Sequence, residues 1–201
     1  MKRKRAYQMV MRADAVEGTR GRILEAAYEL WRAEAYDDVS LERVAERAGV
    51  SKQTLIRHFG SKDQLLIATV DWQRPREEAA RAAEPGNVPA AVAALVARYE
   101  QMGDANVRLL ALEDRVPAIQ YLLEQGRESH RQWVERAFEP FLPARGSAAY
   151  RTRVMAFYAA TEVTVWKLLR RDFRLSRKQT EAVLLELVSG LAASEWKEGP
   201  R

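Results

Sequence analysis

The sequence contains no cysteine and only two histidines among its 201 residues. The lack of cysteine excludes disulfide frameworks, cysteine-ligated zinc, iron–sulfur clusters and thiol catalysis. His58 and His130 stand too far apart for the H-x-x-x-H pair of a zinc-binding helix. No nucleophile–base pair, phosphate-cradling glycine loop or metal-ligand cluster stands out. We therefore expect neither an enzyme nor a bound cofactor or metal.

Long apolar runs are also absent, since no segment reaches the roughly 18 apolar residues that span a bilayer. The stretch from Lys2 to Arg5 carries four positive charges and imitates the start of a signal peptide. The apolar stretch after it ends at Arg12 and Asp14, which is too short for the core of a signal peptide. We expect a soluble, cytoplasmic protein without membrane contact.

Signals for β-strands are scarce, because valine and isoleucine fall at helical spacing and Asn-Gly or Asp-Gly turns are missing. Alanine, leucine, glutamate, arginine and glutamine dominate, and all of them favour helices. The sequence predicts an all-α protein of about nine helices, with a C-terminal helical bundle after a three-helix domain. The expected helices cover residues 20–35, 41–48, 52–59, 62–83, 88–102, 104–115, 118–141, 147–171 and 177–195.

Capping residues mark the expected ends of several helices. A serine or threonine side chain can accept a hydrogen bond from the first free N–H groups, and glycine suits the position after the last turn. A Ser-x-x-Gln pattern also allows the reciprocal bonds of a capping box. The expected N-caps are Thr19, Ser51, Ser61 and Ser176, and the expected glycine stops are Gly49 and Gly103.

Three short helices with a glycine between the second and third are the ingredients of a helix-turn-helix. In that motif the second helix crosses the DNA backbone and the third enters the major groove. Leu55 and Phe59, four positions apart, can form the buried side of the third helix, which leaves its polar residues for solvent or DNA. The spacing alone is more often plain bundle packing than DNA binding.

Residues 20–66 resemble the N-terminal domain of the TetR family of transcriptional repressors. The resemblance runs in order and spacing through Ile23-Leu24-Glu25-Ala26-Ala27, Val44 to Ser51 and Lys52 to Leu66. It covers about a quarter of the chain. It implies a DNA-binding repressor that a small-molecule ligand releases from a palindromic operator. It also implies a homodimer, joined through the last two helices.

The resemblance assigns the DNA-reading helix to Lys52–Phe59 and a phosphate-binding lysine to Lys62. The family usually has tyrosine where this chain has Ile56, which therefore lacks a hydroxyl donor. Ile56 either contacts a thymine methyl group or packs inward and adds no specificity. The residues expected to bind DNA are Arg20, Arg43, Lys52, Gln53, Thr54, Ile56, Arg57, His58 and Lys62.

The expected domains are a flexible basic extension (1–18), the helix-turn-helix domain (19–66) and a ligand-binding and dimerisation domain (67–201). The helix at 62–83 connects the last two, and 84–89 is the best linker. Three interpretations of the extension stay open. It lies along DNA as a basic arm, it is a disordered tail, or the true start is Met11.

A ligand pocket is suggested by polar residues among apolar ones in the C-terminal half. Glu162 stands in an apolar stretch, where a buried carboxylate needs a partner or a ligand, although an ion pair or exposure at the rim also explains it. His130 is expected on a solvated helix face, and the basic run 170–174 at a helix end, where cations suit the helix dipole. The expected pocket residues are Tyr99, Met102, Trp133, Phe138, Met155, Tyr158, Glu162 and Trp166, a mixture that suggests a bulky hydrophobic or cationic ligand.

The last two expected helices carry apolar stripes that suit a two-fold, four-helix dimer interface. Small residues at 189–193 would permit a close approach of these helices. An alternative to the ligand-responsive repressor is a DNA-binding regulator without an effector, controlled by a protein partner. Whether the protein represses or activates depends on operator position, and the sequence identifies neither the operator nor the ligand.

Overall fold

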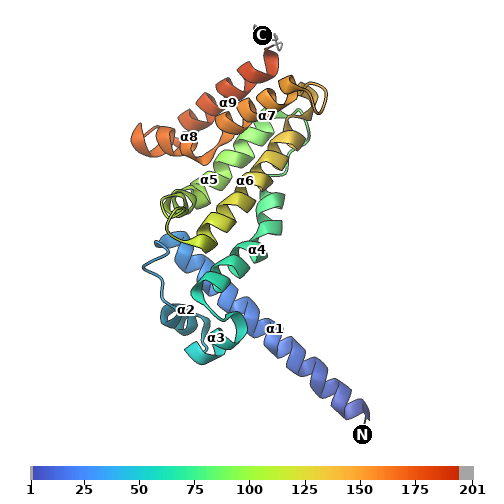
Figure 1. The fold of residues 1–201 in the computed structure, drawn as a ribbon, viewed down its shortest axis with the longest axis vertical. Helices are drawn as coiled ribbons and strands as arrows, with labels where there is room; N and C mark the ends of the chain where they lie inside the picture. The colour runs from blue at the N-terminus through green and yellow to red at the C-terminus, as the bar shows by residue number, and fades with distance from the viewer. Residues whose placement is uncertain (1, 195–201) are drawn as a thin grey trace.

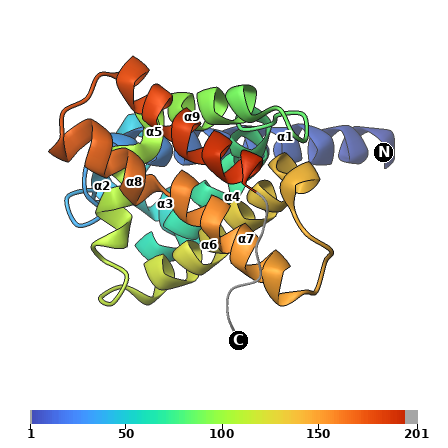
Figure 2. The same ribbon diagram turned by 90° about the horizontal axis from the view of Figure 1, so that it is seen from above.

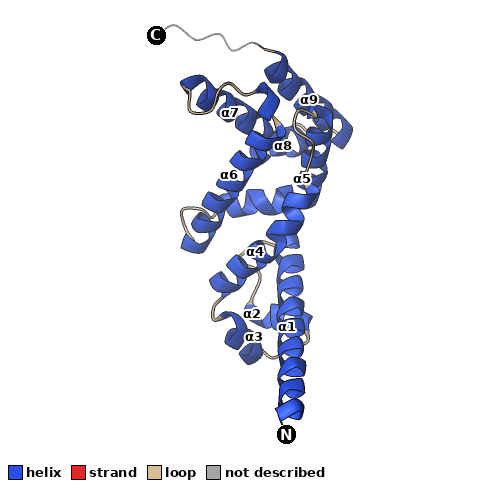
Figure 3. Cartoon of the chain, turned by 90° about the vertical axis from the view of Figure 1, so that its right-hand side faces the viewer, coloured by secondary structure: helices blue, strands red, loops and turns tan. Residues whose placement is uncertain are grey.

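The computed structural model describes residues 2–194, with side chains from residue 17 onward. It is all helical, as the sequence predicts, and these residues include no strand (Figure 3). None of their helices is both long and apolar enough to cross a membrane. The helices are α1 (Lys2–Ala33), α2 (Leu41–Ala48), α3 (Lys52–Phe59), α4 (Lys62–Ala80), α5 (Val88–Leu110), α6 (Pro117–Ala137), α7 (Ala148–Thr161), α8 (Val163–Lys167) and α9 (Arg177–Ala193).

The helices enclose two hydrophobic cores, towards opposite ends of an elongated molecule (Figure 1). Helices α1 to α4 surround the first core, where Ile23, Leu55 and Leu65 are fully buried. Helices α5 to α9 surround the second core, which is centred on Phe157 and Trp166. Helix α9 packs across α5 and α7 at this end, as the view from above shows (Figure 2).

Helix α1 begins at Lys2, far before the expected start at residue 20. Thr19 lies inside this helix, so its expected role as an N-cap is wrong. The preceding residues are mostly good helix formers, and neither Gly18 nor Gly21 interrupts the backbone. The side chains of the basic cluster and Met1 lie outside the described part of the chain, so the role of the extension stays a prediction.

Gly103 does not end a helix. Helix α5 continues through it to Leu110, so the two helices expected at 88–102 and 104–115 are one. Gly103 is buried against Trp166, and a Cβ atom at this position would overlap the tryptophan ring. Glycine at this position therefore allows α5 and α8 to pack closely. The sequence of α5 alone does not reveal this contact.

The helix expected at 147–171 is broken at Glu162. This residue has an extended backbone, and its carboxylate accepts a hydrogen bond from the Thr164 N–H at 2.7 Å. Glu162 thus caps α8, which turns away from α7. A π-helical turn, Leu168–Asp172, follows α8.

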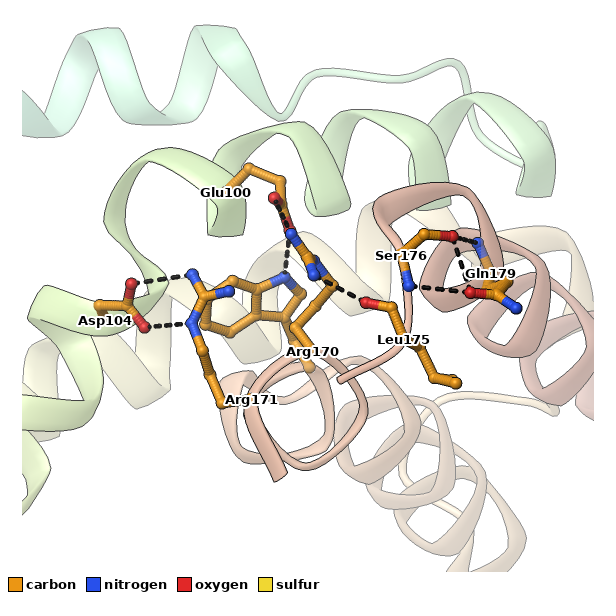
Figure 4. A network of polar contacts seen from close by, with 8 residues as sticks. Glu100, Asp104, Arg170, Arg171, Leu175, Ser176 and Gln179 are labelled. Carbon is orange, nitrogen blue, oxygen red and sulfur yellow. Dashed lines mark hydrogen bonds and ion pairs between the residues drawn. The ribbon is translucent and has the colours of Figure 1, made fainter. Parts of the chain in front are cut away.

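The basic run 170–174 was expected to interact with a helix-end dipole, but its first two arginines make tertiary ion pairs (Figure 4). The Glu100 carboxylate accepts from Arg170 Nε at 2.7 Å and from Trp166 Nε1 at 3.0 Å. Asp104 accepts two bonds from Arg171, each 2.8 Å long. These contacts hold the π-helical turn against α5. Glu100 and Asp104 lie one helical turn apart on the same face of α5.

The other predicted helices agree with the observed bounds to within a few residues, and residue 195 lies outside the described range. Ser176 and Gln179 form the predicted capping box, with reciprocal bonds of 2.9 and 3.2 Å. Ser61 caps α4 by accepting from the Gln64 N–H at 3.2 Å.

Replacing Gly103 with alanine is expected to lower the free energy of unfolding by about 1–3 kcal/mol, because the added methyl group forces the buried Trp166 ring to move. Gly126→Ala is the matched control, since Gly126 is an exposed glycine inside α6 with open space around it. That change is expected to raise stability by about 0.5–1 kcal/mol. Denaturant unfolding at equal protein concentrations measures both. Equal effects of the two substitutions would contradict the close packing.

Candidate DNA-binding surface and internal cavity

Local backbone chemistry sets the angle between α2 and α3. Gly49 has a φ of 66°, the left-handed conformation that glycine adopts without strain. Its N–H donates to the Glu46 carbonyl at 3.1 Å, and the Val50 N–H donates to the Ala45 carbonyl at 3.0 Å. Ser51 then caps α3 by accepting from the Thr54 N–H at 3.1 Å. The second helix therefore ends and the third begins within three residues.

Helix α3 has one buried side and one open side. Leu55 and Phe59 are buried in the first core, as predicted. Ile56 is 41% exposed, so its side chain points outward and away from the core. Six of the predicted DNA-binding residues lie on α3. Lys52, Gln53, Ile56 and Arg57 are exposed, and Thr54 and His58 are half-buried.

Two of the predicted DNA-binding cations are already paired with carboxylates. Lys52 on α3 forms an ion pair with Glu42 on α2. Arg43 makes two bonds to Glu34, of 2.6 and 2.8 Å. The bond from Arg43 lowers the pKa of Glu34, and the bond from Lys52 lowers the pKa of Glu42. Both cations must exchange a carboxylate for a phosphate if they contact DNA.

Lys62 and Arg20 lie over aromatic rings of the first core. The Lys62 ammonium is 4.2 Å from the Tyr36 ring centroid and 3.5 Å from the Asp37 carbonyl oxygen. Burial lowers the pKa of Lys62. The Arg20 guanidinium is 4.7 Å from the Phe59 ring centroid. Lys62 stands at the first turn of α4, where the free N–H groups also favour an anion.

A cavity of about 280 Å³ lies between the two cores. Helices α1, α4, α5 and α6 form most of its wall, and the ends of α7 and α8 close it. Its lining combines apolar side chains with polar and charged ones. Residues from both groups include Trp31, Leu66, Val70, Gln73, Arg81, Arg98, Tyr99, Met102, Leu109, Leu122, Arg127, His130, Tyr158 and Glu162.

The cavity brings together four of the eight residues predicted to line a pocket, namely Tyr99, Met102, Tyr158 and Glu162. Trp133, Phe138 and Trp166 are instead packed in the second core. Met155 is 48% exposed on the outer side of α7. Helical spacing could not separate a residue that faces a cavity from one that faces solid core, because both lie on apolar faces.

His130 was expected on a solvated face, but it is only 7% exposed. Its ring stacks on Trp133 with centroids 5.4 Å apart, and its Nε2 lies 3.1 Å from Thr161 Oγ1. The Thr161 hydroxyl donates to the Phe157 carbonyl at 2.7 Å, so it accepts from the histidine. Burial, and then the positive charge of Arg81, lower the pKa of His130 to about 3. The imidazole is therefore neutral.

Sequence reasoning missed the contribution of α4 to the cavity and the buried ion pair beside it. Arg98 on α5 is only 8% exposed, and its guanidinium makes two bonds to the Glu77 carboxylate on α4. A signal was present, because Arg98 follows Leu95 by three positions on the apolar face of α5. A charge in such a stripe needs a buried partner.

The sequence profile of the bacterial regulatory proteins of the tetR family matches residues 23–69. The N-terminal domain is that of the TetR family. An HTH-type transcriptional regulator of Staphylococcus aureus is 42% identical over 60 residues, which are 30% of this chain and 32% of that protein. The HTH-type transcriptional activator FasR of Mycolicibacterium smegmatis is 41% identical over 51 residues, 25% and 23% of the two chains. The matched segment spans about a quarter to a third of the length of these curated relatives.

Solved structures extend the likeness to the fold of most of the chain. A tetR-family transcriptional regulator from Streptomyces coelicolor has a TM-score of 0.70 at 16% identity, covering 86% of this chain and 81% of its own. GusR from Salmonella enterica has a TM-score of 0.65 at 19% identity, covering 88% and 96%. At these identities the likeness is one of fold.

The buried histidine of this chain predicts a pH dependence of stability. Between about pH 6.5 and pH 3 the unfolded chain binds a proton at His130 that the folded chain does not, so stability falls as pH falls. The slope due to this group is at most about 1.4 kcal/mol per pH unit. In denaturant unfolding, the free energy of unfolding of His130→Gln should fall less than that of the wild type as the pH is lowered from 7 to about 5.

His58→Gln is the control, because it removes the chain's other histidine, which lies half-buried on α3. It should keep the wild-type dependence on pH. A His130→Gln protein with the wild-type slope would show that the buried imidazole does not set this dependence.

Proposed function

We propose that this chain is a DNA-binding transcriptional regulator whose helix α3 enters the major groove. The observation that carries the proposal is the orientation of α3, with Leu55 and Phe59 buried and Gln53 and Arg57 exposed on its other side. Glutamine and arginine can donate paired hydrogen bonds to base edges, and the outward Ile56 can contact a thymine methyl group. The TetR-family match over the same residues supports the assignment.

The regulator acts as a homodimer joined through α7 and α9, which belong to the last two helices that the sequence predicts. Two exposed apolar side chains support this interface, Met155 on α7 and Leu187 on α9, which are 48% and 46% exposed. Exposed small residues on α9, Ser189, Gly190 and Ala193, would let a second copy approach closely. A two-fold dimer presents two copies of α3 about 34–36 Å apart, which suits a palindromic operator.

A small molecule in the cavity controls DNA binding. The protein acts as a repressor, and ligand binding releases it from its operator. The cavity touches α1 and α4 of the first core as well as α5 and α6. A ligand that fits only one arrangement of these helices shifts the population toward it and changes the spacing of the two α3 helices. The cavity favours this mechanism over a regulator without an effector, for which a solidly packed interior is expected.

Replacing Arg57 with alanine tests the DNA-binding surface. DNA is first selected from a random pool by the wild-type protein, and binding to the selected site is then measured at a fixed salt concentration. Arg57→Ala should weaken specific binding by about 10- to 100-fold, because it removes a base-edge donor. The fold should persist, since Arg57 is exposed.

Arg136→Ala is the matched control, because it removes the same charge from an exposed site on α6. It should leave specific binding within about twofold. Equal losses in the two variants would mean that α3 does not read the bases.

Leu187→Arg tests the dimer. An unpaired charge in a buried interface costs several kcal/mol, so the dimer dissociation constant should rise about 100-fold or more. Tyr121→Arg on α6 is the control, because Tyr121 is similarly exposed but lies outside α7 and α9. Sedimentation analysis over a range of concentrations measures both. A Leu187→Arg protein that stays dimeric at the wild-type concentration would refute this interface.

A further inference from the structure

Unpaired hydrogen-bond donors gather on the side chains that line the cavity. Buried N–H groups of Trp31, Arg81 and Arg108 lack an acceptor within the described residues. All three side chains line the cavity. Buried polar groups are normally satisfied, and these three groups are all donors. The residues of the cavity wall therefore carry more hydrogen-bond donors than the described part of the chain satisfies.

Two of these residues, Arg81 and Arg108, are arginines that form no ion pair among the described residues. Arg108 donates to the Arg32 carbonyl at 2.7 Å, so Arg81, which follows α4, is the one whose side-chain hydrogen bond is long. Its guanidinium donates to Ser129 Oγ at 3.5 Å and lies 6.0 Å from the Trp133 ring centroid. Burial lowers the pKa of Arg81, since its charged form is partly removed from water. A desolvated guanidinium without a counter-ion is a strong site for a carboxylate.

The carboxylates around this end of the cavity are occupied or exposed. Glu77 is held by both bonds of Arg98. Glu162 accepts from the backbone and hydroxyl groups of Thr164 at the start of α8. Glu78 is exposed on α4. None of them forms an ion pair with Arg81, so this end of the cavity remains positively charged.

Apolar side chains line the part of the cavity wall beside the first core, together with Arg32 and Arg108. Leu66, Leu109 and Leu122 line it there, and all three pack in or against that core. Leu66 and Arg81 stand at the two ends of the α4 wall, about 22 Å apart at 1.5 Å per residue. The lining therefore offers a cation at Arg81 and apolar side chains near Leu66, at the two ends of the same helix.

We propose that the cavity binds an elongated apolar molecule that carries one carboxylate, with the carboxylate on Arg81 and the apolar body along α4 toward Leu66. This deepens the proposed function, on which it rests for its regulatory meaning. It also replaces the expectation of a cationic ligand, which was based on Glu162. The Ser129 hydroxyl, 3.5 Å from the Arg81 guanidinium, supplies a further hydrogen bond to the carboxylate, and the leucine side chains exclude water from the apolar body.

Three probes that share a ten-carbon chain test the charge of the ligand: decanoate, decan-1-ol and decylammonium. Calorimetric titration of the full chain without DNA should give one decanoate site per chain, with affinity about tenfold or more above that of the other two probes. Equal or tighter binding of decan-1-ol or decylammonium overturns the proposal. So does the absence of saturable binding by all three.

Arg81→Gln locates the carboxylate. It should reduce decanoate affinity about tenfold or more and leave decan-1-ol affinity within about twofold. Arg127→Gln is the matched control, because Arg127 lines the same cavity but is held by Glu113 through bonds of 2.5 and 2.6 Å. It should keep decanoate affinity within about threefold. Equal losses in both variants, with unfolding midpoints unchanged, refute the role of Arg81.

DNA binding is measured separately, with the site selected by the wild-type protein. Decanoate that binds through Arg81 and also releases DNA supports both proposals. Decanoate that binds through Arg81 without releasing DNA leaves the ligand assignment intact and contradicts the regulatory mechanism. Release of DNA by decylammonium but not by decanoate contradicts the ligand assignment and leaves the mechanism intact.

Discussion

Helix α6 packs into both hydrophobic cores, and the arrangement of the other helices depends on this shared packing. Ile119 and Leu122, near its start, belong to the core around the helix-turn-helix. Trp133 and Val134, three turns later, belong to the core of the C-terminal helices. Because protein interiors are close-packed, α6 cannot shift without repacking at both ends. The cavity and His130 lie along this helix between the two cores, where a small displacement reaches both.

Helix α4 is tied down at both ends. At its start, Asp63 accepts a hydrogen bond from the Tyr36 hydroxyl, and Lys62 lies over the same ring. At its end, Glu77 is paired with the buried Arg98. Pro75 lies inside the helix and lacks an N–H, so the backbone has one hydrogen bond fewer there. Any bending of α4 between its fixed ends therefore concentrates near Pro75, next to the cavity wall.

The sequence predicted the features that depend on neighbours along the chain. Gly49, Ser51 and Ser176 act as predicted, because a cap is made by residues within three or four positions. The buried faces of α3 also follow from helical spacing. The errors at Gly103 and His130 have another cause, which is contact between distant segments. Gly103 is explained only by Trp166, and His130 only by Thr161 and the rings around it.

The cavity could be anticipated only in part for the same reason. Its C-terminal wall includes Tyr99 and Glu162, which stand in helices that looked suitable for a pocket. Its other wall comes from α1 and α4, which the sequence assigned to the DNA-binding domain and the connection. The charge of the site could not be inferred from the residues alone, because it depends on which arginines find a carboxylate after folding. Arg127 and Arg98 do, and Arg81 does not.

The ion pairs on the helix-turn-helix have a consequence for the search along chromosomal DNA. Lys52, Arg43 and Arg47 are each held by a carboxylate in the free protein. A phosphate backbone must compete with these internal anions before it gains the cations, so random sequences attract the protein less than its positive charges suggest. Under the proposed function, only a site whose bases also bind the exposed face of α3 compensates for that competition. The carboxylate partners therefore weaken non-specific binding to the rest of the genome.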